Sequence, residues 1–299
     1  MCTYCAVGGL AFKVEGLAFS EVPGNYQPFV VEKADELLFT LRVCEQSGEW
    51  KVESGEWELV HEDKVEEDMP RLEIYKKSDG WVILTAMYRD AEICSKLEAS
   101  SDFAEATLVI NGENGDASLN GAVREFAINN ATMLLFAFTA LKYRALEMHA
   151  SVTVKDDRGY LFLGKSGTGK STHSRLWMEA FEDAWLLNDD NPVVRLEDDG
   201  VWVYGSPWSG KTPCYKNARA RVGAFVRLHQ AAENSIEKAR PSKAYIDVYS
   251  SCSGLKFMPE VRDELYGVIA RVVESVPVFE LDCLPNTEAA QVCAAMCNV

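Results

Sequence analysis

The segment from Gly164 to Ser171 constrains the fold more than any other feature, because it matches the pattern G-x-x-x-x-G-K-[ST] at every fixed position. A backbone that wraps round a phosphate group needs glycines with unusual φ and ψ angles, and N–H groups that converge on the anion. Residues 160–163 form an apolar run that predicts a buried strand, and apolar residues at helical spacing over 176–184 predict a helix. The order of strand, loop and helix favours a phosphate-binding loop over a surface loop rich in Gly, Lys and Ser.

The loop predicts a nucleotide triphosphate as ligand, with ATP and Mg²⁺ as the cofactors. Lys170 would place its ammonium near the β- and γ-phosphates, and Ser171 would give its hydroxyl to Mg²⁺. The positive end of the following helix would face the same phosphates. The residues expected to contact the nucleotide are Gly164, Lys165, Ser166, Gly167, Thr168, Gly169, Lys170, Ser171 and Thr172.

A second segment, residues 185–190, reads as a short strand that ends in Asp189 and Asp190. A Mg²⁺–nucleotide site needs one carboxylate beside Ser171 to bind or position the metal, and a second to take the proton from an attacking hydroxyl. The alternative is an Asx turn before Pro192, which Asp and Asn favour. We interpret the pair as catalytic and metal-binding, and a coupled pair leaves open which carboxylate has which role.

Charge and cysteine content narrow the range of partners and compartments. The net charge of −16 is spread along the chain, which argues against nonspecific binding to nucleic acid or to an anionic membrane. The nine cysteines show no disulfide framework and the start shows no targeting segment, so we expect a cytoplasmic protein. Residues 131–141, the longest apolar stretch, are too few to cross a bilayer. Cys2 and Cys5 are a weak zinc signal and read as part of a frayed terminus.

The periodicity divides the chain into parts and predicts a mixed α/β fold. Residues 1–120 read as a β-rich region, mostly an antiparallel meander. Residues 121–147 read as a long connecting helix. Residues 148–299 contain the loop and read as a P-loop nucleotide-binding domain, with further helices over 259–276 and 287–296.

Residues 149–151 (His-Ala-Ser), 164–172 and 188–190 (Asn-Asp-Asp) together resemble a known family. They look like the nucleotide domain of HPr kinase/phosphorylase and its relatives, which shares a fold with the phosphoenolpyruvate carboxykinases. The short gap between loop and acidic pair is the most telling similarity, and the resemblance covers about residues 147–284. It implies a phosphoenolpyruvate carboxykinase-like P-loop domain with kinase-like chemistry. It also implies a place for His149 close to the transferred phosphate, with an electrostatic role or a role in orienting an Asp.

The chain also departs from this family. HPr kinases carry an acidic residue after the loop serine, where this chain has Thr172, and a later Gly-rich signature, where this chain has residues 205–211. These departures argue against HPr as the substrate and against the reverse phosphorolysis. Full carboxykinases are longer and bring Arg-rich motifs that have no clear counterpart here.

Positive charges after the acidic pair are candidates for substrate contacts. Residues 205–211 read Gly-Ser-Pro-Trp-Ser-Gly-Lys and resemble an element of short members of the superfamily. Either this loop, with Lys211, offers donors and a cation to phosphate or substrate, or it is a tight turn with a packed indole. Arg219 and Arg221, with Lys216 nearby, are either solvated or meet a phosphate or acidic substrate. The substrate candidates are therefore Lys211, Arg219 and Arg221.

The leading hypothesis is a Mg²⁺- and ATP-dependent kinase that transfers the γ-phosphoryl group to a hydroxyl of a protein, a peptide or a small molecule. Its expected catalytic residues are His149, Lys170, Asp189 and Asp190, and its expected metal-binding residues are Ser171, Asp189 and Asp190. The second hypothesis is an ATP-binding regulatory module without transfer, and a phosphoenolpyruvate carboxykinase is the third. Nucleic acid and membranes are not expected partners, and assembly into a homo-oligomer stays open.

Overall fold

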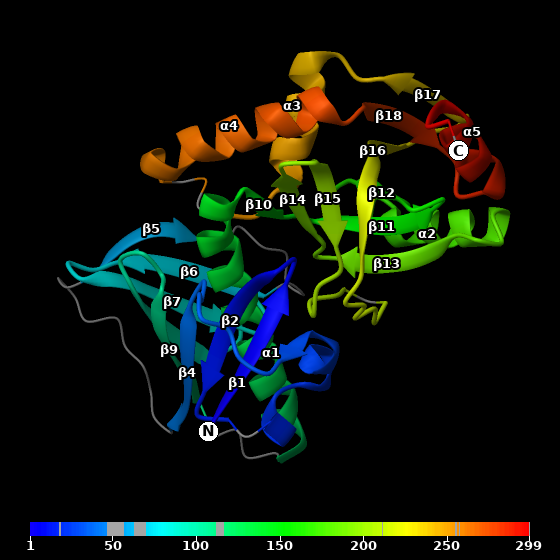
Figure 1. Cartoon of the computed structure of the whole chain (residues 1–299). Helices are drawn as coiled ribbons and strands as arrows, with labels where there is room; N and C mark the ends of the chain where they lie inside the picture. The colour runs from blue at the N-terminus through cyan, green and yellow to red at the C-terminus, as the bar shows by residue number, and fades with distance from the viewer. Residues whose placement is uncertain are drawn as a thin grey trace. The chain divides into compact units, whose positions relative to one another are not determined.

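The computed structural model describes residues 1–17, 19–46, 57–62, 70–111, 117–210, 212–254, 256 and 258–298. The chain divides into two compact units, Met1–Thr139 and Ala140–Val299. Each unit is built round its own nine-stranded sheet (Figure 1). Within the described residues, no helix combines the length and apolarity needed to cross a membrane.

The first unit contains a mixed sheet with the strand order β3-β1-β2-β4-β9-β8-β7-β6-β5. Its strands are β1 (Cys2–Val7), β2 (Leu10–Glu15), β3 (Val30–Val31), β4 (Thr40–Gln46), β5 (Glu58–Glu62), β6 (Arg71–Lys76), β7 (Gly80–Ala86), β8 (Ser95–Ser100) and β9 (Glu105–Asn111). Short 3-10 helices η1 (Phe19–Glu21) and η2 (Gly24–Phe29) precede β3. Strands β5 to β9 form an antiparallel meander, whereas β4 pairs in parallel with both β2 and β9.

The segment read from the sequence as a frayed terminus is instead the hairpin of β1 and β2. Val7 pairs with Leu10 across a turn in which Gly8 and Gly9 have φ angles of 59° and 76°. Two residues with positive φ match the twist of the flanking strands, and glycine adopts this conformation at least cost. Cys2 and Cys5 lie three positions apart on β1, so their side chains point to opposite faces of the sheet and do not form a pair.

The helical segment expected over 121–147 is divided in the structure. The α-helix α1 spans Ala117–Thr139 and is followed by the 3-10 helix η3 (Ala140–Tyr143) and by strand β10 (Ala145–Glu147). Arg144, between η3 and β10, has a φ of 57°, and its N–H donates to the carbonyl of Leu141 at 2.7 Å. A left-handed residue cannot continue a right-handed helix, so the chain turns here into the second sheet.

The second unit contains the glycine-rich loop, which follows an interior strand of its sheet, β12. The main strand order is β10-β14-β15-β16-β12-β11-β13, and β18 joins β16 and β17. The elements are β11 (Ala150–Lys155), β12 (Arg158–Leu163), α2 (Lys170–Ala180), β13 (Trp185–Asp190), β14 (Val193–Glu197), β15 (Gly200–Tyr204), β16 (Arg219–Gln230), β17 (Ser235–Lys238), α3 (Pro241–Ser251), α4 (Pro259–Ser275), β18 (Val278–Cys283) and α5 (Thr287–Met296). Strand β16 runs parallel to both β12 and β18, and the other pairings are antiparallel.

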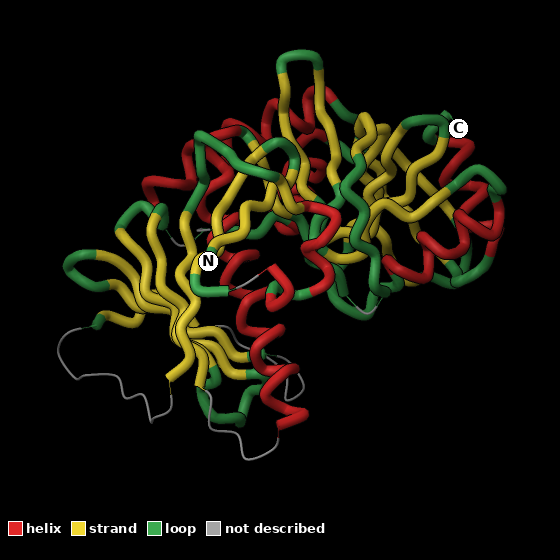
Figure 2. The backbone as a smooth tube through the Cα atoms, turned by 60° about the horizontal axis from the view of Figure 1, so that its bottom comes forward, coloured by secondary structure: helices red, strands yellow, loops and turns green. Residues whose placement is uncertain are grey.

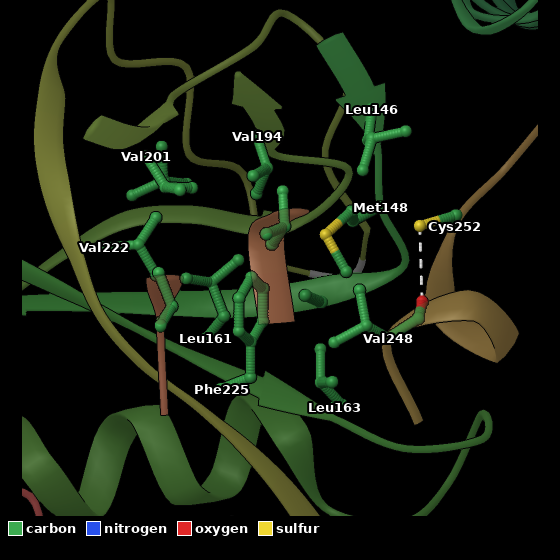
Figure 3. Packing of buried hydrophobic residues seen from close by; sticks show 14 of the residues in the cluster. Leu146, Met148, Leu161, Leu163, Val194, Val201, Val222, Phe225, Val248 and Cys252 are labelled. Atoms are coloured by element: carbon green, nitrogen blue, oxygen red, sulfur yellow. Dashed lines mark hydrogen bonds between the residues drawn. The ribbon is translucent and has the colours of Figure 1, made fainter. Parts of the chain in front are cut away.

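Helices cover both faces of this second sheet, as Figure 2 shows with helices in red and strands in yellow. On one face, α3 and α4 pack on a cluster of buried apolar side chains that includes Leu161, Phe225 and Val248 (Figure 3). On the other face, α2 and α5 pack on a second cluster that includes Trp177. Helix α3 was not expected from the sequence, although Pro241 occupies its first turn as proline commonly does.

Candidate functional site

The loop between β12 and α2 has the conformation that its glycines permit. Gly167 and Gly169 have φ angles of 76° and 109°, and Gly169 is the residue that precedes the first turn of α2. Side chains are strongly disfavoured at such angles. At Gly164, a Cβ atom would lie 2.9 Å from the Cβ of Thr168, so the loop closes tightly on itself. The backbone therefore makes the tight, glycine-dependent turns that a phosphate-binding loop requires.

Lys170 lies at the centre of the site. Its side chain is buried, and its Nζ lies 3.1 Å from the carbonyl oxygen of Gly164 and 2.9 Å from Nε2 of His149. Burial lowers the pKa of Lys170, while the carboxylates of Asp190 and Asp189 act in the opposite direction. A cation that is partly desolvated and held close to the loop is suited to attract phosphate oxygens.

The two adjacent aspartates have different hydrogen-bond partners. Asp189 is buried, and its Oδ1 accepts a hydrogen bond of 2.9 Å from the hydroxyl of Ser171. Oδ1 of Asp190 lies 3.0 Å from Nε2 of His149. Successive residues of a strand point to opposite faces, which explains why one carboxylate meets the start of α2 and the other meets His149. The structure thus brings together all of the expected catalytic residues.

Asp190 has an unusual backbone and a charged environment. Its φ of 113° lies in a region that residues with side chains rarely adopt, and such strain costs on the order of 1–3 kcal/mol. Burial raises the pKa of Asp190, but the hydrogen bond and electrostatic interaction with His149, together with the charge of Lys170, outweigh it and leave the pKa lowered. Asp190 is therefore ionised at neutral pH and available to accept a proton.

His149 is positioned by the third helix rather than by the loop. Its backbone N–H donates to the carbonyl of Ser251, at the end of α3, at 2.7 Å. Its Nε2 lies within hydrogen-bond distance of both Lys170 and Asp190. One ring nitrogen cannot accept from the ammonium and donate to the carboxylate at the same time, so the tautomer of His149 decides which partner it serves.

The segment 205–210 forms hydrogen bonds to the backbone of the acidic pair. The hydroxyl of Ser209 and the N–H of Gly210 donate to the carbonyl of Asp189 at 2.9 Å and 2.7 Å. A Cβ atom on Gly210 would lie 3.0 Å from the Cβ of Asp190. Asn188 donates through Nδ2 to the Ser206 hydroxyl at 3.2 Å and accepts from the N–H of Asn191 at 3.0 Å. Lys211, a predicted substrate residue, lies outside the described residues.

Arg219 and Arg221 lie at the far end of their strand from the loop. In the parallel pairing, Arg221 is opposite Arg158 at the start of β12, whereas the loop follows the last residue of β12. Arg221 forms an ion pair of 2.7 Å with Asp199, and the guanidinium of Arg219 stacks 4.2 Å from the ring of Trp202. The structure does not bring these two arginines to the glycine-rich loop, because they lie at the opposite end of β16. Their placement agrees with the solvated alternative.

Two charged residues near the site were missed by the sequence analysis, and the first is Arg227. It lies opposite Leu163, the last strand residue before the loop, in the parallel pairing of β16 with β12. Its side chain is 16% exposed, its Nε lies 3.9 Å from Oδ1 of Asp247, and its charge contributes to the lowered pKa of Lys170 after the larger effect of burial. A single arginine inside the apolar run 222–228 was the signal that could have identified it.

The second missed residue is Glu147, at the end of β10. Its side chain is 2% exposed. Burial raises its pKa to about 7, and the charge of Asp190 acts in the same direction, while Ser253 and Lys256 oppose the rise. Nothing in the sequence around Glu147 distinguishes it from an exposed glutamate, because its burial depends on the elements that pack over β10.

The described residues do not form a metal site by themselves, since no three His, Cys, Asp or Glu side chains come together to hold an ion. Mg²⁺ in nucleotide sites keeps several waters and takes one or two carboxylates together with phosphate oxygens. The hydroxyl of Ser171 and the carboxylate of Asp189, in contact with one another, fit that requirement.

If the chain transfers the γ-phosphoryl group of ATP, as its sequence predicts, Arg227→Gln is expected to slow that transfer by at least about tenfold, because it removes a cation from the edge of the sheet where the loop lies. The fold should persist, since Asp247 keeps its ion pair of 2.7 Å with Lys243. Transfer from γ-labelled ATP is the measurement. Arg221→Gln, at the other end of the same strand, is the matched control and should be neutral; a slow Arg221→Gln beside a normal Arg227→Gln would restore the substrate role to Arg221.

Comparisons with known proteins add a fold-level observation. No family model matches the chain, and no curated protein does. Among solved structures, the HPr(Ser) kinase/phosphatase from Coxiella burnetii is similar, with a TM-score of 0.32 and 11% identity over 51% of this chain and 88% of that chain. A likeness this weak assigns no role to any residue.

Proposed function

We propose that the chain is a Mg²⁺- and ATP-dependent phosphotransferase that acts on a hydroxyl group. The observation that carries the proposal is the meeting of Lys170, the pair of Ser171 and Asp189, and the pair of His149 and Asp190 around one glycine-rich loop. A phosphate-binding module without chemistry needs the loop and the lysine, but it does not need a strained, ionised carboxylate beside a histidine. Phosphoryl transfer needs positioning, charge neutralisation and a proton acceptor.

The different partners of the two aspartates support a division of roles. Asp189 accepts from Ser171, so these two groups would hold Mg²⁺, which supplies charge neutralisation for the phosphates when bound. Asp190 faces His149 and Lys170 and would accept the proton of the attacking hydroxyl. A carboxylate with a low pKa is a weak base, which suits a loose transition state in which the proton leaves late.

The proposed reaction needs only ATP and the acceptor hydroxyl as reactants. The oxygen of the acceptor hydroxyl forms a bond to the γ-phosphorus, and the bond from that phosphorus to the oxygen bridging to the β-phosphate breaks. ADP leaves with the electron pair of that bond. The hydroxyl proton would pass to Asp190, and Lys170, held at the loop, would lie beside the phosphate oxygens.

Asp189→Asn and Asp190→Asn form a matched pair that tests the proposal. With Asp189→Asn, the Mg²⁺ concentration for half-maximal transfer should rise at least about tenfold, because a neutral amide is a weaker ligand. With Asp190→Asn, ATP affinity should stay within about threefold while the transfer rate falls by about 10²-fold or more. Transfer is measured with γ-labelled ATP on pooled serine peptides and on pooled small hydroxyl compounds.

The outcomes separate the candidate functions. If Asp190→Asn raised the Mg²⁺ requirement and Asp189→Asn lowered only the transfer rate, the proposed roles of the two aspartates would have to be exchanged. Undiminished transfer in both variants would contradict the proposal. Tight ATP binding by the unsubstituted protein, with no labelled product and no released phosphate, would favour a regulatory module instead.

A further inference from the structure

A pocket of about 400 Å³ lies beside the phosphate loop and is not used by the proposed chemistry. We infer that it holds the base and sugar of the nucleotide, and that it does so by apolar packing with little discrimination between adenine and guanine. This inference rests on the proposed function, because it concerns the donor of that reaction.

The pocket is continuous with the loop. Its lining begins at Gly169 and Thr172 and continues to Ala231 and Cys283, which lie at the ends of β16 and β18. Strands β12, β16 and β18 are parallel neighbours, so the segments that follow them meet at one edge of the sheet. Ligands of open α/β sheets bind outside this edge. A ligand whose phosphates lie in the loop would therefore extend its remaining part into this pocket.

The walls of the pocket suit a flat aromatic group. Leu176 of α2 forms one side, and Ala231, Leu284 and Pro285 form others. Ligand pockets are commonly apolar with a few polar groups that fix orientation. The amide nitrogen of Gln230, at the border with the loop, is occupied within the protein, because Nε2 donates to the carbonyls of Gly167 at 3.2 Å and Thr168 at 3.4 Å.

Several polar groups of the far wall are engaged within the protein. The N–H of Ala231 donates to the carbonyl of Cys283 at 3.2 Å, and the N–H of Leu284 donates to Oδ1 of Asn234 at 2.8 Å. The carbonyl of Leu284 accepts from the N–H of Asn286 at 2.9 Å.

His173, which also lines the pocket, is engaged as well. Nε2 of His173 accepts from the indole of Trp177 at 3.1 Å, and burial lowers the pKa of His173 to about 4, so its ring is neutral at neutral pH. Strong selection between bases requires groups that pair with the edge of the base, and an apolar pocket lacks that means.

The test compares ATP, GTP and inorganic tripolyphosphate in calorimetric titrations with Mg²⁺. ATP and GTP should bind with dissociation constants within about tenfold of each other, whereas a site that pairs with the base edge gives roughly 10⁴-fold selection. Ala231→Phe, which fills the pocket, should weaken the binding of ATP at least about tenfold and leave the binding of tripolyphosphate unchanged. Ala232→Phe is the matched control, since Ala232 is exposed and does not line the pocket.

A second measurement needs no substitution. ATP should protect Cys283 from alkylation, detected by mass spectrometry, while tripolyphosphate should not; the exposed Cys44 should react equally in all samples. Equal weakening of ATP and tripolyphosphate by Ala231→Phe, no protection of Cys283, or selection between ATP and GTP above about 10²-fold would each overturn the inference. Absence of binding of both ATP and tripolyphosphate to the unsubstituted protein would instead refute the proposed function.

Discussion

Lys170→Ala is expected to lower the rate of phosphoryl transfer by about 10³-fold. The ammonium lies at the start of α2, within hydrogen-bond distance of the loop carbonyl of Gly164 and of His149, and is the charge best placed to balance the phosphate oxygens. Removing a preorganised charge from a partly desolvated site loses stabilisation that water does not replace. ATP affinity should fall as well, and both quantities are measured with γ-labelled ATP and by calorimetry.

The variant should remain folded, which makes its loss of activity interpretable. Burial lowers the pKa of Lys170, so the folded state holds this ammonium at a cost and does not depend on it for stability. Lys238→Ala, an exposed lysine at the end of β17, is the matched control and should transfer phosphate normally. A Lys170→Ala protein with an unchanged thermal midpoint and unchanged turnover would refute a role for the loop in catalysis.

Glu147→Gln is expected to remove a change of about 3 kcal/mol in the free energy of unfolding that the unsubstituted protein undergoes between about pH 4.5 and pH 7. The folded state raises the pKa of Glu147 from 4.5 to about 7, a rise worth about 3 kcal/mol. Because the folded pKa is the higher one, the folded state binds the proton more tightly. The stabilisation that the protonated Glu147 carboxyl contributes is fully present below pH 4.5 and is lost as the pH rises to about 7. The glutamine variant lacks this loss, since it does not titrate.

Chemical denaturation at several pH values between 4 and 8 measures the difference, if the transition is two-state. The free energy of unfolding of Glu147→Gln, minus that of the unsubstituted protein, should increase with pH up to about 7 and then become constant. Glu237→Gln, on the exposed β17, is the control and should give a difference that does not vary in this range. Parallel stability curves for Glu147→Gln would show that the buried carboxyl keeps its ordinary pKa.

The parts of the site that could be predicted from the sequence are those formed by residues close together in the chain. The glycines of the loop, the strand before it and the helix after it occupy one continuous segment, and each is specified by neighbours a few positions away. The acidic pair ends a strand, so its position at the end of that strand also follows from local pattern. The hairpin of β1 and β2 is equally local, and the adjacent glycines Gly8 and Gly9 are a sequence signal for its turn.

The sequence of this protein by itself determined that a glycine-rich loop lies between a strand and a helix, with a lysine, a serine and two carboxylates available. Only the tertiary structure decided that His149 faces Asp190, that Arg227 rather than Arg221 lies at the loop end of β16, and that Glu147 is buried. The physical reason is that these relations depend on strand pairing and on the packing of α3. Such contacts join residues far apart in the chain, and their energies depend on burial that no local pattern encodes.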